Sequence, residues 1–185
     1  MPTSTEWNAR YQVNDEQPVA CEVLANYTHL LPTTGKALDL ACGLGANARL
    51  LSQYGLETHA WDYADVAIAQ LQQRAPTIHT QVKDIIQQPP TPATYDVIVV
   101  CHFLERALIR PIINALKPNG LLFYQTFIQE QVSDRGPKRA EFRLSNNELL
   151  QLCHELRLLI YHEEGRVGNL TQGFRDQVLF IGQKL

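Results

Sequence analysis

Residues 37–48 read ALDLACGLGANA, and this stretch decides the fold. Its first part, ALDLA, is a short apolar run typical of a buried strand. Gly43 and Gly45 interrupt the run, and the residues that follow favour a helix. A strand that turns through glycines into a helix brings bare backbone N–H groups and a helix N-terminus close to a ligand. The sequence therefore predicts that a cofactor binds at this turn.

Strands and helices alternate around the turn, which favours βαβ units and a doubly wound, mostly parallel α/β sheet. The predicted strands are 37–41, 57–61, 77–82, 95–101 and 121–127. The predicted helices are 18–31, 46–54, 64–74 and 104–116. After a polar loop over 129–143, a capping box predicts one more helix near 146–154. Two last strands, 156–162 and 174–182, are expected to form an antiparallel pair at one edge of the sheet.

The chain has 185 residues, which suits one domain over 1–185 with an N-terminal arm over 1–16. The arm is polar except for Trp7 and Tyr11. These two aromatic residues either anchor the arm to the body or close it over a bound ligand. The sequence leaves both interpretations open.

The composition limits the expected partners and location. A net charge of −3 gives no electrostatic signature of nucleic-acid binding, so no nucleic-acid partner is expected. The four cysteines lack C-x-x-C spacing and the histidines lack paired spacing, so no metal site is expected. The chain shows no signal-peptide pattern and no apolar run of membrane-spanning length. We therefore expect a cytoplasmic protein without a membrane partner.

Two cofactor classes fit the glycine turn. Residues 43–48 satisfy G-x-G-x-x-A, a pattern of dinucleotide-binding proteins. However, Asp39 lies in the strand just before the turn, where a carboxylate suits a positively charged ligand better than a pyrophosphate. Asp62 follows the next strand about 20 residues later, where an acid can accept both ribose hydroxyls. Ribose binding of this kind is common to nicotinamide and S-adenosylmethionine sites.

Further candidate cofactor residues follow the second and third strands. Asp84 could accept a hydrogen bond from an adenine amine, Ile85 could pack on one face of the ring, and Tyr63 could cover the other. Each acid also has a structural interpretation, because Asp39 and Asp62 could cap turns and Asp84 could be solvated.

Residues 37–127 resemble a class I S-adenosylmethionine-dependent methyltransferase. The resemblance is carried by LDLACGLGANA, WDYAD, VKDI, YDVIVVCHFLER and LKPNGLLFYQTF, which occur in the family's order. W-N-A-R-Y near the start and the F-L-x-R of residues 103–106 make the chain similar to small bacterial tellurite-resistance-like methyltransferases. This resemblance implies a Rossmann-like, seven-stranded sheet of order 3-2-1-4-5-7-6 whose last strand is antiparallel.

The resemblance also implies roles for individual residues. The glycine turn would hold the methionine part of S-adenosylmethionine, with Ala41 standing where many relatives have a first glycine. Cys101 or His102 would lie beneath the sulfonium, and Arg10 on the arm would pair with the cofactor carboxylate.

The sequence indicates least about the methyl acceptor. No N-P-P-Y-type motif follows the fourth strand, which argues against a nucleobase or amide nitrogen. His102 and Arg106 are the candidate catalytic residues near the acceptor. Cations of the 129–143 loop either attract a small anion or belong to a solvated surface; they are Arg135, Lys138, Arg139 and Arg143. We expect a small-molecule acceptor, a soft nucleophile such as a thiol or chalcogen oxyanion.

Two other functions use the same turn. One is a nicotinamide-dependent oxidoreductase, although the chain has no evident catalytic Tyr-Lys pair and no separate substrate domain. The other is a module that binds S-adenosylmethionine and methylates nothing.

Overall fold

A computed structural model describes residues 3–13 and 18–185. Its centre is one seven-stranded sheet of order β3-β2-β1-β4-β5-β7-β6, so the predicted fold class is confirmed. The strands are β1 (Lys36–Leu40), β2 (Glu57–Asp62), β3 (His79–Val82), β4 (Tyr95–Cys101), β5 (Leu116–Phe127), β6 (Arg157–Glu163) and β7 (Gln177–Gln183). Strands β1 to β5 pair in parallel, whereas β7 runs antiparallel to both β5 and β6. The two predicted C-terminal strands therefore do form an antiparallel pair.

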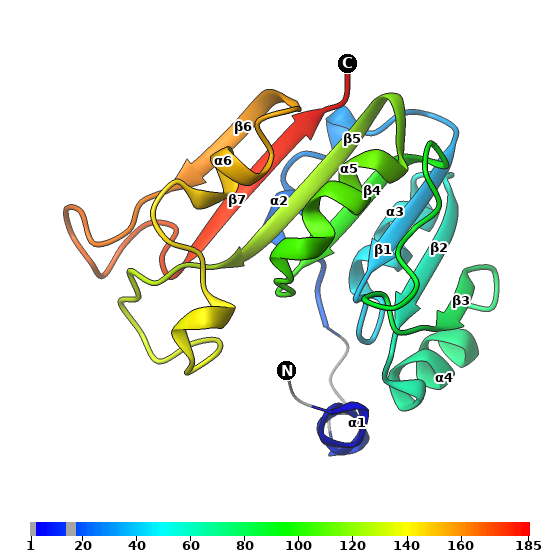
Figure 1. The fold of residues 1–185 in the computed structure, drawn as a ribbon. Helices are drawn as coiled ribbons and strands as arrows, with labels where there is room; N and C mark the ends of the chain where they lie inside the picture. The colour runs from blue at the N-terminus through cyan, green and yellow to red at the C-terminus, as the bar shows by residue number, and fades with distance from the viewer. Residues whose placement is uncertain (1–2, 14–17) are drawn as a thin grey trace.

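Helices cover both faces of the sheet (Figure 1). They are α1 (Ser4–Val13), α2 (Glu22–Ala25), α3 (Ala46–Gln53), α4 (Asp65–Arg74), α5 (Ile109–Ala115) and α6 (Glu148–Leu152). Short 3₁₀ turns span Thr28–Leu30, Arg106–Leu108 and Ala140–Phe142. Helices α5 and α6 pack on one face, while α2 and α3 pack on the other.

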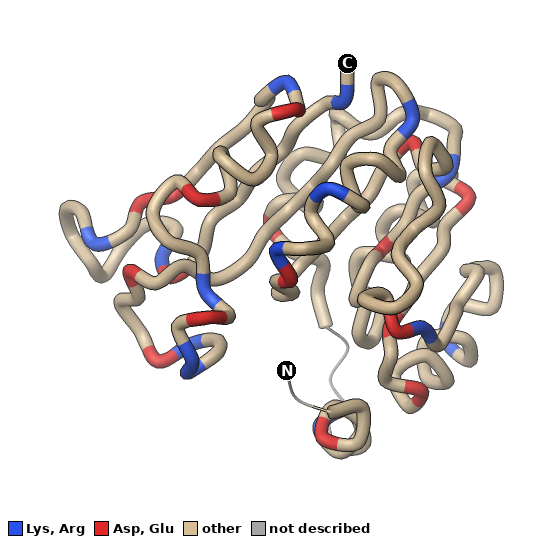
Figure 2. The backbone as a smooth tube through the Cα atoms, viewed as in Figure 1, with Lys and Arg blue, Asp and Glu red and all other residues tan. Residues whose placement is uncertain are grey.

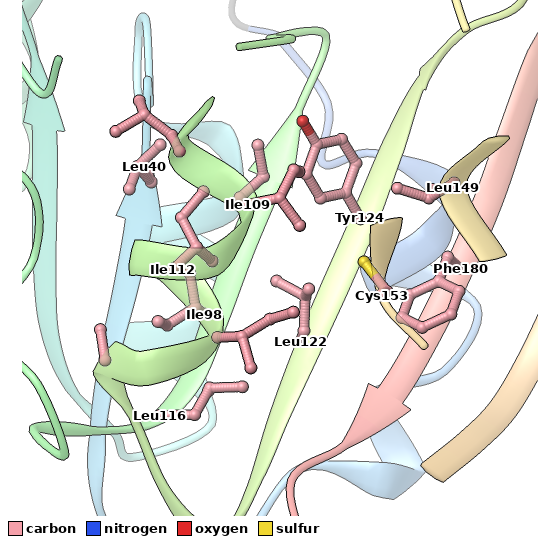
Figure 3. Packing of buried hydrophobic residues seen from close by; sticks show 14 of the residues in the cluster. Leu40, Ile98, Ile109, Ile112, Leu116, Leu122, Tyr124, Leu149, Cys153 and Phe180 are labelled. Carbon is pink, nitrogen blue, oxygen red and sulfur yellow. The ribbon is translucent and has the colours of Figure 1, made fainter. Parts of the chain in front are cut away.

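The larger core cluster lies under α5 and α6 (Figure 3). Ile112 of α5 and Leu149 of α6 are completely buried against the sheet, where Ile98 and Tyr124 meet them. Residues 97–100 of β4 are completely buried, as their unbroken apolar run predicts for a central parallel strand. A second cluster on the opposite face holds α2 and α3. The carboxyl ends of the parallel strands are thereby fixed beside one another.

The predicted helix over 18–31 is wrong, because only residues 22–25 are α-helical. Side chains from elsewhere bind the preceding segment and hold it extended. Arg49 donates to the Pro18 carbonyl, and Asn47 accepts from the Cys21 N–H group at 2.9 Å. The chain then ends the helix at Ala25 and makes a 3₁₀ turn.

The predicted helix over 104–116 is too long at its start and slightly too long at its end. The Phe103 carbonyl accepts from the hydroxyl of Tyr124 at 2.9 Å, and Glu105 caps the 3₁₀ turn that precedes α5. Strand β5 begins at Leu116, where it already pairs with Tyr95.

The predicted helix over 146–154 is also shorter than expected. Only the half of the capping box in which Glu148 accepts from the Ser145 N–H group is present, at 2.8 Å. Asn147 precedes the helix with a φ of 60°, so α6 starts at Glu148.

The expected arm contains a helix, α1, over much of its length. The end of the arm near residues 14–16 lies outside the described residues. Among residues 3–13 and 18–185, no helix has the length and apolar character that a membrane span requires.

Candidate functional site

The glycine turn joins β1 to α3 in a backbone conformation that side chains oppose. Ala41, Gly43 and Gly45 have φ angles of 59°, 52° and 73°. A Cβ atom at Gly45 would lie 2.4 Å from Leu71, and one at Gly43 would lie 2.8 Å from the Tyr11 hydroxyl. Both positions therefore require glycine, whereas Ala41 tolerates the left-handed region at a cost of about 1 kcal/mol. The turn is a cradle that a Cβ atom would fill.

Two buried carboxylates hold this cradle. Asp39 accepts from the Ala48 N–H group at 2.9 Å, and Asp62 accepts from the N–H groups of Gly43 at 2.8 Å and Ala64 at 2.9 Å. Burial raises the pKa of Asp39 to about 7, and burial likewise raises the pKa of Asp62. A cationic group beside Asp39 would favour the ionised carboxylate, which fits the ammonium of an amino-acid ligand.

Helix α1 covers the cradle. Asn8 binds Asp65 of α4 at 2.5 Å, and the Tyr11 carbonyl accepts from Gln70 at 3.1 Å. Trp7 and Tyr11 stack at 5.8 Å and pack against a small buried cluster that includes Leu44. The structure thus supports the anchoring interpretation for this helix, which is bound to α4 and lies over the turn, and closure over a bound ligand stays a prediction.

The remaining predicted cofactor residues lie around this cradle. Asp84 and Ile85 follow β3, which is tied to the end of β2 by a 2.8 Å bond from the Lys83 N–H group to the Asp62 carbonyl. The Asp84 side chain is exposed and accepts from the Ile86 N–H group, while Ile85 is buried in the larger core cluster. Tyr63 directly follows β2 and is half-buried.

Arg10 lies on the exposed side of α1, with its guanidinium 4.7 Å from the centre of the Trp7 ring. The structure therefore places it on the arm as predicted, but against an aromatic ring.

Two cysteines and a histidine meet at the carboxyl end of β4. Cys21 lies 4.0 Å from Nδ1 of His102, whose Nε2 is 2.9 Å from the Gln177 side-chain oxygen. The His102 ring stacks on Phe127 at 5.0 Å, and the residue has a φ of 55°. Cys101 also contacts Cys21 through its thiol. This group of three residues, Cys21, Cys101 and His102, is called the β4-end cluster below.

The β4-end cluster separates charge between its members. The hydrogen bond from Cys101, and then the contact with His102, lower the pKa of Cys21 to about 5. Burial lowers the pKa of His102, but the contacts with Cys21 and Gln177 outweigh burial and raise it. Burial keeps the Cys101 pKa well above its ordinary value, so this thiol stays protonated and donates. These contacts favour the ionised form of the Cys21 thiol.

Sequence reasoning missed the partners of this cluster. Asn47 joins it to the cradle, since it accepts from the Cys21 N–H group and its amide lies 3.5 Å from Asp39. Gln177 comes from β7, far along the chain. The position of Asn47 directly after the glycines was the single available signal, and nothing in the sequence pointed to Cys21 or Gln177.

A direct prediction concerns the Cys21 thiolate. A thiol with a pKa of about 5 is ionised above that pH, so alkylation of Cys21 by iodoacetamide should be almost independent of pH between 6 and 8. The rate should fall as the pH drops through about 5. Peptide mass spectrometry would measure the rate at this residue, with Cys21→Ser as the blank. A rate that rises steadily up to pH 9 would contradict the assignment.

Arg106 is used within the chain. Its Nε donates to Glu148 at 2.5 Å, and its other nitrogens donate to the carbonyls of Glu141 at 2.7 Å and Arg143 at 3.0 Å. These bonds fasten the segment before α6 to the start of α5. Arg106 is predicted to lie near the acceptor. Its contacts within the chain fit a positioning role there better than direct contact with the acceptor.

The basic residues of the 129–143 loop are mostly paired. Lys138 lies 3.3 Å from Asp134, and Arg139 lies 2.6 Å from Glu141. Acidic and basic residues are interspersed along this part of the chain (Figure 2). The positive charge of Arg135 lowers the pKa of His102 and so opposes the contacts with Cys21 and Gln177 that raise it. Among these basic residues, Arg135 thus influences the β4-end cluster through its charge.

Two surface hollows lie away from the cradle. One, of about 380 Å³, is lined by Gln131, Val132, Ser133, Asp134 and Arg166, and the other, of about 300 Å³, lies between α3 and the end of α4. Neither adjoins the glycine turn, which α1 covers. The chemistry of the side chains, rather than hollow volume, locates the candidate site.

Known proteins share this fold and part of the sequence. Residues 37–120 match the family described as a methyltransferase domain. This segment runs from β1 into the first residues of β5, and so includes the cradle and Asp62. No curated protein matches the chain in sequence.

Several solved structures superpose well on the chain. TehB from Haemophilus influenzae has 21% identity and a TM-score of 0.72, over 97% of this chain and 67% of that one. A TehB-like S-adenosylmethionine-dependent methyltransferase from Corynebacterium glutamicum has 19% identity and a TM-score of 0.67, over 98% of each. Geranyl diphosphate C-methyltransferase from Streptomyces coelicolor A3(2) has 12% identity and a TM-score of 0.71, over 100% of this chain and 99% of that one. At these identities the likeness concerns the fold.

The fold and the matched segment define the class. Residues 37–120 match the methyltransferase domain family, and the chain has the sheet order expected of a class I S-adenosylmethionine-dependent methyltransferase. This match supports S-adenosylmethionine as the cofactor over the nicotinamide cofactor considered from the sequence.

Proposed function

We propose that this enzyme methylates a small soft nucleophile, a thiol or a chalcogen oxyanion, as a member of the tellurite-resistance-like group. The observation that carries the proposal is the β4-end cluster, which places two sulfur atoms and an imidazole beside the cradle. The free cysteines accord with a reducing compartment, so we also propose a cytoplasmic location.

The residues of the cradle fit the cofactor. Gly43 and Gly45 let the Tyr11 hydroxyl and Leu71 approach the turn closely, and Asp39 would accept from the ammonium group of the methionine part. Asp62 would accept from the ribose hydroxyls with the lone pairs that its two backbone contacts leave, and Asp84 would accept from adenine. S-adenosylmethionine supplies a methyl group on a sulfonium, which needs no further activation.

The chain's own task is to orient the acceptor and exclude water. Both nitrogens of His102 are already engaged, one with Cys21 and the other with Gln177. His102 is therefore poorly placed to remove a proton from an acceptor. An acceptor that is ionised at neutral pH, such as a thiolate or an oxyanion, requires no such base.

His102 and Cys21 would instead shape the acceptor side of the site. Polarizable sulfur atoms favour a soft partner, and the ring of His102 fixes one wall through its stacking on Phe127. Arg106 would act at a distance by holding the loop that carries Arg135 and Arg143.

The test is a panel of acceptors with S-adenosylmethionine labelled in its methyl group. We expect label transfer to small thiols, selenols or chalcogen oxyanions, detected as volatile products by headspace mass spectrometry. Transfer only to amines or phenols would contradict the proposed acceptor class. No transfer in any reaction, despite cofactor binding, would favour a non-catalytic module.

A further inference from the structure

A second group of side chains lies at the end of β2 that is remote from Asp62. Glu57 and His59 are two residues apart and so project from the same face of β2. His79, the first residue of β3, is the register partner of His59. One ligand atom from each of the three residues lies within 4.8 Å of the others.

We propose that Glu57, His59 and His79 form a binding site for a divalent transition-metal ion, and that Zn²⁺ fits this ligand set. Two imidazoles and one carboxylate are a donor set typical of zinc, with water in the fourth position. The site is separate from the cofactor cradle and does not depend on the proposed acceptor.

The geometry suits a metal ion. Nε2 of His59 lies 3.1 Å from Oε1 of Glu57, and two ligands at tetrahedral angles around zinc lie about 3.3 Å apart. The rings of His59 and His79 have their centres 4.9 Å apart. The parallel pairing of β2 with β3 sets this spacing, so the ligands need only rotate to converge.

The surroundings keep His59 ready to coordinate. Its ring packs edge-on against Tyr95 at 5.9 Å, which restricts its rotation.

One neighbouring charge opposes the ion. Nζ of Lys36 lies 3.0 Å from Oε1 of Glu57. A bound cation must compete with this ammonium group for the carboxylate. Removal of the Lys36 charge should therefore strengthen metal binding. A substitution that only disturbed the fold would not strengthen it.

The metal would fasten β3 to the rest of the sheet. β3 has four residues and pairs with β2 at one edge of the sheet. A bridge between His59 and His79 would cross-link the two strands and limit fraying of the edge. Sequence spacing did not predict such a site, because its ligands come from two strands and not from one local motif.

The experiment is a Zn²⁺ titration of the untagged full chain against a chromophoric chelator. We expect one equivalent bound by the wild type, and an affinity loss of about a hundredfold or more in His59→Ala and His79→Ala, beyond what loss of an outer-shell partner costs. Lys36→Gln should bind more tightly. Co²⁺ should give visible ligand-field bands in the wild type that both histidine variants lose.

His162→Ala is the matched control. His162 lies on β6 with Nε2 2.8 Å from Oε1 of Glu164, the same two-residue arrangement as His59 and Glu57. It should keep the wild-type stoichiometry and affinity. The proposal is overturned if the wild type binds no equivalent, or if His79→Ala and His162→Ala bind alike. Circular dichroism will show whether each variant is folded. If a histidine variant is unfolded, the Zn²⁺ affinity of Lys36→Gln decides, and an affinity no higher than that of the wild type overturns the proposal.

Discussion

Asp62→Ala is expected to lower the affinity for S-adenosylhomocysteine by about a hundredfold or more, equivalent to about 3 kcal/mol. Two losses add up in this variant. The Asp62 carboxylate accepts from the Gly43 and Ala64 N–H groups, so its removal loosens the cradle. It also removes the acceptor that we propose for both ribose hydroxyls. Isothermal titration calorimetry would measure the change.

Two variants separate these losses. Asp62→Asn retains a carbonyl oxygen of the same shape but loses the charge, so its affinity should lie between those of the wild type and Asp62→Ala. Asp134→Ala removes a fully exposed carboxylate and should bind as the wild type does. Unchanged affinity in Asp62→Ala would exclude this residue from the cofactor site.

Arg143→Ala is expected to destabilise the fold by about 3 kcal/mol, because it removes a donor from one buried carbonyl and two part-buried ones. Arg143 is 3% exposed. Its guanidinium donates to the carbonyls of Pro137 and Ile128 at 2.8 Å each and to that of Arg135. It also lies 5.5 Å from the centre of the Phe127 ring. Urea unfolding followed by circular dichroism would measure the loss.

The matched control is Arg139→Ala in the same loop. Arg139 is exposed, where its guanidinium pairs with Glu141 and lies 5.4 Å from the centre of the Phe142 ring, so its loss should cost less than about 0.5 kcal/mol. Arg143→Lys should rescue little, since an ammonium group cannot reproduce the planar set of donors. Equal unfolding midpoints for the two alanine variants would contradict the structural role of Arg143.

The fold was largely predictable from local pattern. The glycine turn, the apolar run of β4 and the alternation of strands with helices each depend on neighbouring residues, and all of them are present. Two of the wrong boundaries share one cause, which is contact with residues distant in the sequence. Asn47 and Arg49 keep residues 18–21 extended, and Tyr124 fixes the segment before α5.

The candidate site was predictable only where it follows the strand ends. Asp39 and Asp62 lie at the cradle because the strands that carry them are parallel neighbours. Cys21, the residue before α2, and Gln177 of β7 both contact His102 in the β4-end cluster. No spacing in the sequence predicts these contacts. The sequence predicts a catalytic place for Arg106 near the acceptor. It does not show the carboxylate and carbonyl partners of Arg106, because they lie more than 30 residues away.

A crystal structure of the protein with S-adenosylhomocysteine tests the central claim most directly. The account predicts the ribose hydroxyls within hydrogen-bonding distance of Asp62, the homocysteine part along Gly43 to Gly45, and the sulfur atom facing Cys101 and His102. Helix α1 should lie over the ligand. A ligand bound elsewhere, or one that touches the glycine turn without contacting Asp62, would contradict the account.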